Sequence, residues 1–143
     1  MSNDVLIFRS SRFSLDPPRD HRGILPDCPL GDDIAAFFAT ELPKQYPQWS
    51  CGEPKLEDSW SSLDCQQDER TLALVFTYFP AAEIDDQWAV QFTPHTGIFW
   101  FLRRRRPDLL ADLVACVSQI VDSHPEAFDA VRWASEAEFL AAA

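Results

Sequence analysis

Residues 70–79 constrain the fold most strongly, because apolar side chains fill both alternating sets of positions in this segment. Successive side chains of a strand point to opposite faces of a sheet. One face would carry Leu72, Leu74, Phe76 and Tyr78, and the other would carry Ala73, Val75 and Phe79. A strand that is apolar on both faces is typical of a sheet that is covered on both sides. The segment therefore predicts a central strand.

Neighbouring segments extend this strand into a sheet. Residues 87–93 alternate between apolar and polar side chains, which predicts a strand with one buried face. Residues 94–97, Pro-His-Thr-Gly, have the composition of a turn, and residues 98–102 return as an aromatic strand. These segments predict a three-strand meander over residues 70–103. Shorter strands are expected at residues 5–8, 48–52, 59–65 and 131–133.

Helices are predicted where apolar side chains recur every three to four residues. The first covers residues 32–42, where Asp32 is expected to cap the free N–H groups and Asp33 to suit the positive end of the helix dipole. Pro43 is expected to end this helix. Two further helices are predicted at residues 108–122 and, from a capping box at Ser135, at residues 135–143.

Together these elements predict an α+β fold with an antiparallel sheet of about four to five strands and two or three helices packed on one face. The length of 143 residues predicts a single domain, residues 1–143. Residues 1–31 are expected to form an Arg- and Pro-rich lead segment, largely irregular because Pro and Gly interrupt regular structure. A segment of this kind is expected either to wrap the core or to carry function.

The formal net charge of −11 limits the partners that the chain could bind. A strongly negative surface disfavours nucleic acid and anionic membranes, so neither is predicted as a partner. The charge favours a basic protein partner, or it serves solubility alone. No apolar run reaches the length of a membrane span.

The four cysteines, Cys28, Cys51, Cys65 and Cys116, form no Cys-x-x-Cys pair. No secretory signal is recognised, so we expect a cytoplasmic protein with reduced thiols. Cys51 and Cys65 lie in strand-like segments among apolar residues, which favours buried core thiols. No neighbour in the sequence would lower the pKa of either thiol, although a neighbour in space could.

No residue is predicted to be catalytic, to bind a cofactor or to bind a metal ion. His21, His95 and His124 lie far apart and have no ligand partner at a metal-binding spacing. The sequence holds no Gly-x-Ser-x-Gly motif and no Gly-rich phosphate loop. Adjacent carboxylates on one strand or helix point apart, so the pairs Glu57-Asp58 and Asp85-Asp86 are not expected to act together on one substrate. Both pairs are interpreted as turn residues.

Residues Arg103–Arg106 form an unbroken run of four arginines between a predicted strand and a predicted helix. Strand geometry would divide their side chains between two faces. We interpret the run as neutralising neighbouring acidic residues. Contact with an acidic partner or a phosphate-bearing ligand is the alternative.

The tryptophans indicate where a partner could bind. Trp88 and Trp100 are expected in the core. Trp49 and Trp60 lie in acid-flanked segments. Trp60 follows Glu57-Asp58, and an aromatic side chain beside carboxylates is a candidate anchor for a basic partner. Core packing is the more common role of a single tryptophan. The predicted partner-binding residues are Glu57, Asp58, Trp60, Asp85 and Asp86.

Four short motifs are spread over most of the chain. They are Ile7-Phe8-Arg9, Gly31-Asp32-Asp33-Ile34-Ala35, Glu53-Pro54 followed by Glu57-Asp58-Ser59-Trp60, and Val131-Arg132-Trp133. In these motifs the chain resembles an uncharacterised group of small bacterial proteins, but it departs from their Trp-Gly-Trp core at Ser59 and Ser61. The group has no established activity. In size, acidity and lack of a catalytic set, the chain is similar in general character to bacterial toxin-immunity proteins.

Three hypotheses follow for function. The first is an acidic protein-binding module, an immunity protein that neutralises a basic toxin domain by charge and shape complementarity. The second is a small-ligand binder or an enzyme with a dispersed site near Arg103–Arg106. The third is a homodimeric structural module that pairs through an exposed strand edge.

Overall fold

The computed structural model describes residues 5–10, 12–13, 30–57, 60–81, 84–94 and 107–135. The elements are, in chain order, β1 (Val5–Arg9), α1 (Asp32–Gln45), β2 (Ser50–Cys51), β3 (Lys55–Leu56), β4 (Ser61–Gln67), β5 (Arg70–Ala81), β6 (Ile84–Pro94), α2 (Pro107–Asp122) and β7 (Asp129–Ala134).

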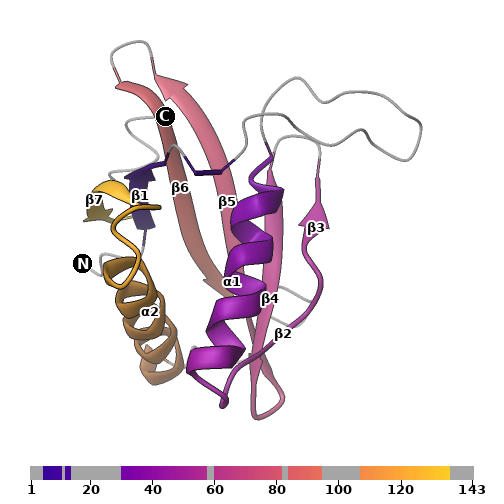
Figure 1. Cartoon of the computed structure of the whole chain (residues 1–143). Coiled ribbons are helices and arrows are strands. Elements are labelled where there is room, and N and C mark those ends of the chain that lie inside the picture. The colour runs from indigo at the N-terminus through magenta and orange to yellow at the C-terminus, as the bar shows by residue number, and fades with distance from the viewer. Residues whose placement is uncertain are drawn as a thin grey trace.

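The seven described strands form one antiparallel sheet (Figure 1). Their order is β2-β4-β5-β6-β1-β7, and β3 pairs with the same edge of β4 as β2 does. The predicted α+β class with an antiparallel sheet is confirmed. The strand count exceeds the expected four to five, because the edge of β4 carries two separate strands of two residues each.

Strand β1 sits between β6 and β7, although it comes first in the chain. Its side chains from Val5 to Phe8 are all buried. Leu6 and Phe8 join the main core, whereas Val5 and Ile7 form a small cluster with other side chains on the opposite face. This short strand is therefore buried on both faces, as are residues 87–90 of its neighbour β6.

The central strand predicted at residues 70–79 is β5, which pairs with β4 and β6. Leu74 and Phe76 are fully buried on one face, as expected. On the other face Ala73 and Val75 are only half-buried, so the expectation of full cover on both sides is wrong for the described part of β5. The cross-strand neighbours of Ala73 and Val75 on β4 are polar, which is the physical reason that this face is not a second core.

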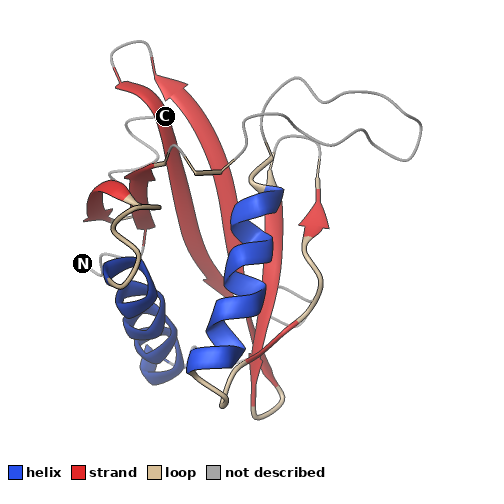
Figure 2. Cartoon of the chain, in the orientation of Figure 1, coloured by secondary structure: helices blue, strands red, loops and turns tan. Residues whose placement is uncertain are grey.

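Helices α1 and α2 lie side by side and pack on one face of the sheet (Figure 2). The main core is a single cluster that both helices share with the sheet. Its largest fully buried side chains from these elements include Ile34, Phe38, Leu42, Leu113, Phe76 and Trp88. The apolar surface buried between the helices and the sheet makes the largest favourable contribution to the free energy of folding.

The ends of α1 differ from the prediction. Gly31 precedes the helix in a left-handed conformation, and Asp32 is a residue of the first turn rather than the cap. Burial and the charge of Asp33 raise the pKa of Asp32. Pro43 lies inside the helix, which continues to Gln45 because a proline near the C-terminal end removes only one N–H donor from the final turn.

The other elements apart from β3, which was not predicted, lie close to their predicted positions, with α2 and β7 matching the segments at 108–122 and 131–133. The predicted strand at residues 98–102 lies outside the described residues. So does the predicted helix at 135–143, apart from Ser135.

Substitution of Gly31 tests the approach of α1 to the sheet. Gly31 has φ of 74°, and an added Cβ would lie 2.9 Å from Trp88 Cζ3 and 3.1 Å from Phe76 Cβ. We expect Gly31→Ala to lower the free energy of unfolding by about 1–3 kcal/mol, measured by urea denaturation.

Gly52→Ala is the matched control, because nothing lies within 4 Å of its added Cβ. Its free energy of unfolding should stay within about 0.5 kcal/mol of the native value. Equal effects of the two substitutions would contradict the packing described here.

Candidate functional site

The pairing of β3 with β4 brings two predicted site residues together. The N–H of Glu57 donates to the carbonyl oxygen of Trp60 at 2.8 Å, and Leu56 pairs with Ser61 across the two strands. This short connection places Glu57 and Trp60 at one end of the hairpin. We call the hairpin of residues 55–62, of which 55–57 and 60–62 are described, the β3–β4 hairpin.

The β3–β4 hairpin exposes large apolar side chains. Leu56 is 48% exposed and Trp60 is 42% exposed, and Glu57 beside them is exposed too. Among the described residues the other large apolar side chain that is exposed is Val131, on β7 at the opposite edge of the sheet. Leu56 pairs with Ser61, so the side chains of Leu56 and Trp60 lie on opposite faces of the hairpin, whereas Glu57 and Trp60 share one face.

Charges around the β3–β4 hairpin are arranged so that the acidic groups dominate. Lys55 Nζ lies 2.9 Å from Asp64 Oδ2, and this hydrogen-bonded ion pair raises the pKa of Lys55. Glu57 adds a weaker effect in the same direction. The Lys55 charge is thus compensated by Asp64, and the exposed carboxylates of Glu53 and Glu57 leave the region negative.

The other predicted site residues do not join this hairpin within the described structure. Asp58 lies outside the described residues. Asp85 and Asp86 belong to β6, whose neighbour is β5 and not β4, and their side chains are not described. The last residue pair between β4 and β5 is Ser61 with Phe76, but β5 continues beyond it and pairs with β6 as far as Ala81 and Ile84. Asp85 and Asp86 therefore lie at the same end of the sheet as Ser61, beyond the start of β4. The structure brings Glu57 and Trp60 together and keeps the β6 pair on a different strand.

Trp49, whose exposure the sequence left open, belongs to the core. Its side chain is 1% exposed, and its Nε1–H donates to Asp112 Oδ2 at 3.1 Å. The segment after α1 folds back under α2, where Tyr46 Oη also donates to Gln119 Oε1 at 2.6 Å. Acidic neighbours in the sequence therefore did not indicate exposure. The core position predicted for Trp88 is confirmed, whereas Trp100 lies outside the described residues.

Two side chains that the sequence did not single out together are Cys51 on β2 and Cys65 on β4. Their Sγ atoms are 4.0 Å apart. Cys65 is fully buried, in agreement with the core-thiol prediction, but Cys51 is only half-buried. The hydrogen bond between the thiols lowers the pKa of Cys51, while the same bond and burial raise the pKa of Cys65. No sequence spacing identifies this pair, because the contact depends on strand pairing.

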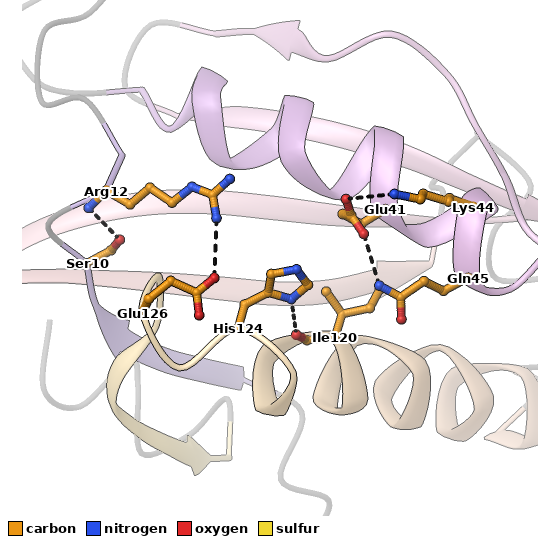
Figure 3. Close-up of polar contacts among 8 residues, drawn as sticks. All are labelled: Ser10, Arg12, Glu41, Lys44, Gln45, Ile120, His124 and Glu126. Atoms are coloured by element: carbon orange, nitrogen blue, oxygen red, sulfur yellow. Dashed lines mark hydrogen bonds and ion pairs between the residues drawn. The ribbon is translucent and has the colours of Figure 1, made fainter.

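A second polar region lies where the ends of α1 and α2 meet the lead segment (Figure 3). Arg12 lies 3.7 Å from Glu126 and 5.3 Å above the ring of Phe37. His124 Nδ1 lies 2.8 Å from the carbonyl oxygen of Ile120. Phe13 is buried against Phe37, so the described part of the lead returns to the core. These contacts fasten the lead segment and the helix end, and we assign them a structural role.

No group of three or more His, Cys, Asp or Glu side chains in the described ranges is placed to hold a metal ion. None of the helices that the structure describes has the length and hydropathy needed to cross a membrane. The arginine run at 103–106 lies outside the described residues.

Comparisons of the chain with protein-family models, with curated proteins and with solved structures found no significant match. The resemblance to small bacterial proteins therefore stays a prediction from the sequence motifs.

Trp49 is buried and Trp60 is exposed, and substituting each one tests which of the two is available to a partner. Trp49→Ala removes a buried side chain and a hydrogen bond to Asp112, so we expect the free energy of unfolding to fall by about 3–5 kcal/mol. Trp60→Ala removes an exposed side chain and should cost about 1 kcal/mol or less. Chemical denaturation measures both, and a larger loss for Trp60→Ala would show that Trp60 is a core residue.

Proposed function

We propose that this chain is an immunity protein that binds a basic toxin domain through the β3–β4 hairpin. The observation that carries the proposal is the exposed Trp60 beside Glu57, on a chain with a net charge of −11. We further propose that the protein acts in the cytoplasm, which agrees with half-buried and buried cysteines that are free thiols.

Trp60 would act as the anchor. Tryptophan is enriched among the residues that dominate binding energy, because its large ring removes much apolar area from water in one partner pocket. Leu56 is also exposed, but it lies on the other face of the hairpin and is not part of this contact. A stable complex needs about 1,200–2,000 Å² of total buried surface, so the hairpin would form the centre of a wider contact.

The acidic groups would make binding specific for a basic partner and raise the rate of association. Glu57 and Glu53 are exposed near the anchor, and Asp64 compensates the charge of Lys55. A negative surface attracts a basic protein over distances of about 8–10 Å at physiological salt and raises the association rate. The same charge opposes nucleic acid and anionic membranes.

The other hypotheses gain less support from the described residues. A homodimer could pair through the edge at β3 or at β7, but a charge of −11 on each copy opposes self-association. Light scattering at low and high salt distinguishes this case, because screening would strengthen a homodimer and weaken the proposed complex. No described residue bears on the ligand site suggested near Arg103–Arg106.

The decisive experiment is a binding titration with a partner captured by the tagged chain from its native cells and then purified. Trp60→Ala should raise the Kd roughly thirtyfold, equivalent to about 2 kcal/mol, because the anchor is lost. Val131→Ala is the control, since Val131 is comparably exposed on the opposite edge of the sheet. Glu57→Lys should slow association several-fold at low salt and less at high salt.

Asp122→Lys makes the same charge change as Glu57→Lys at an exposed position on α2 and controls for net charge. Expression of the chain should also protect cells from the captured partner. Equal losses of affinity in Trp60→Ala and Val131→Ala would contradict the assigned surface. A captured partner that is not basic, or that does no harm to cells lacking this chain, would contradict the immunity function.

A further inference from the structure

Cys51 and Cys65 face each other at a special position of the antiparallel ladder. β2 and β4 pair Ser50 with Gln66 and Cys51 with Cys65. The N–H of Gly52 donates to the carbonyl oxygen of Asp64 at 3.1 Å, so the adjacent pair is the hydrogen-bonded one. Because the two kinds of pair alternate, Cys51 and Cys65 form a non-hydrogen-bonded pair, in which opposite Cα atoms lie about 4.5 Å apart.

This geometry is compatible with a disulfide bond. Disulfides join Cα atoms that are about 4.4–6.8 Å apart, and their S–S bond is about 2.05 Å long. The two Sγ atoms are 4.0 Å apart as thiols. Small rotations about the Cα–Cβ bonds would bring them to bonding distance, and the β2–β4 pairing would not have to change.

The two thiols differ in access. Cys51 is half-buried at the short edge strand β2, whereas Cys65 is fully buried beneath it. Cys51 can therefore react with a small molecule from solvent, whereas Cys65 is accessible only to Cys51. The lowered pKa of Cys51, which results from the hydrogen bond with Cys65, increases its thiolate fraction. This pair has the arrangement of an attacking thiol and a resolving thiol.

We propose that Cys51 and Cys65 form a thiol–disulfide exchange site that takes low-molecular-weight disulfides, such as oxidised glutathione, as oxidant. The proposal does not rest on the proposed immunity function, because it concerns only the strand pair and its thiols.

The exchange runs in two balanced steps. The Cys51 thiolate attacks one sulfur of the disulfide, a protein–glutathione S–S bond forms, and the first glutathione thiolate leaves and takes up a proton. Cys65 then attacks Cys51 Sγ and expels the second glutathione thiolate, which takes up the proton of Cys65. In total the protein loses two electrons and two protons, and one disulfide molecule becomes two thiols.

The new bond would close the chain between residues 51 and 65. This loop contains β3 and the whole β3–β4 hairpin. β2 and β3 are each only two residues long and pair with β4 alone among the described strands. A covalent link from β2 to β4 would therefore restrict the freedom of a segment that few hydrogen bonds hold. The redox state of the pair would set how firmly Leu56, Glu57 and Trp60 are positioned.

The test uses the full chain with Cys28→Ser and Cys116→Ser, so that the pair holds the remaining thiols. The folded protein is equilibrated with mixtures of reduced and oxidised glutathione, quenched with acid, alkylated and mapped by mass spectrometry. We expect an intramolecular Cys51–Cys65 disulfide, seen as a linked peptide that has lost two hydrogens. It should disappear after reduction with dithiothreitol. Two free thiols in the folded protein at the most oxidised mixture would overturn the proposal.

Single substitutions in the same background test the separate roles. Cys65→Ser should accumulate glutathione on Cys51, because the resolving thiol is missing. Cys51→Ser should leave Cys65 unmodified, because Cys65 is buried. Equal glutathione labelling of the two variants would contradict these roles. Far-UV circular dichroism checks that each variant is folded, and if Cys65→Ser is not folded, the peptide map of the pair decides alone.

Discussion

The packing of α1 against the β5–β6 hairpin is the interaction on which the rest of the structure depends. The ring of Phe38 stacks on Phe76, with centroids 5.9 Å apart and an interplanar angle of 20°. Gly31 permits this approach, since any larger residue would collide with Trp88 and Phe76. In the same hairpin, β6 pairs with β1 and β5 pairs with β4, so both halves of the sheet are attached to it. Loss of this contact would remove both the core and the support of the β3–β4 hairpin.

The sequence predicted the parts of the fold that depend on local periodicity. A continuous apolar run located β5, apolar–polar alternation located β6, and the three- to four-residue repeat located both helices. It could not predict that β1 lies between β6 and β7, because the choice of a strand partner leaves no local pattern. β3 is too short for any periodicity to show. The burial of Trp49 could not be predicted for a related reason: its packing against α2 is a contact between distant segments.

The candidate site was predictable only in part, for the same physical reason. Glu57 and Trp60 are close in sequence, and a backbone hydrogen bond joins them. The Cys51–Cys65 pair arises from strand register, which also gives Cys51 the neighbour in space that the sequence could not supply. Both proposals therefore meet in one segment. The β3–β4 hairpin supplies the exposed surface. The cysteine pair between β2 and β4, farther along β4, would control how tightly that surface is held to β4.

The claim that the β3–β4 hairpin is the binding surface is tested most directly by hydrogen–deuterium exchange of the chain with and without its purified partner. β3 is an edge strand of two residues, so its amides should exchange quickly in the free chain. The account predicts that the partner slows exchange in residues 52–62 and leaves β7, at the opposite edge, unchanged. Slower exchange confined to β7 or to the exposed sides of the helices, with residues 52–62 unaffected, would contradict it.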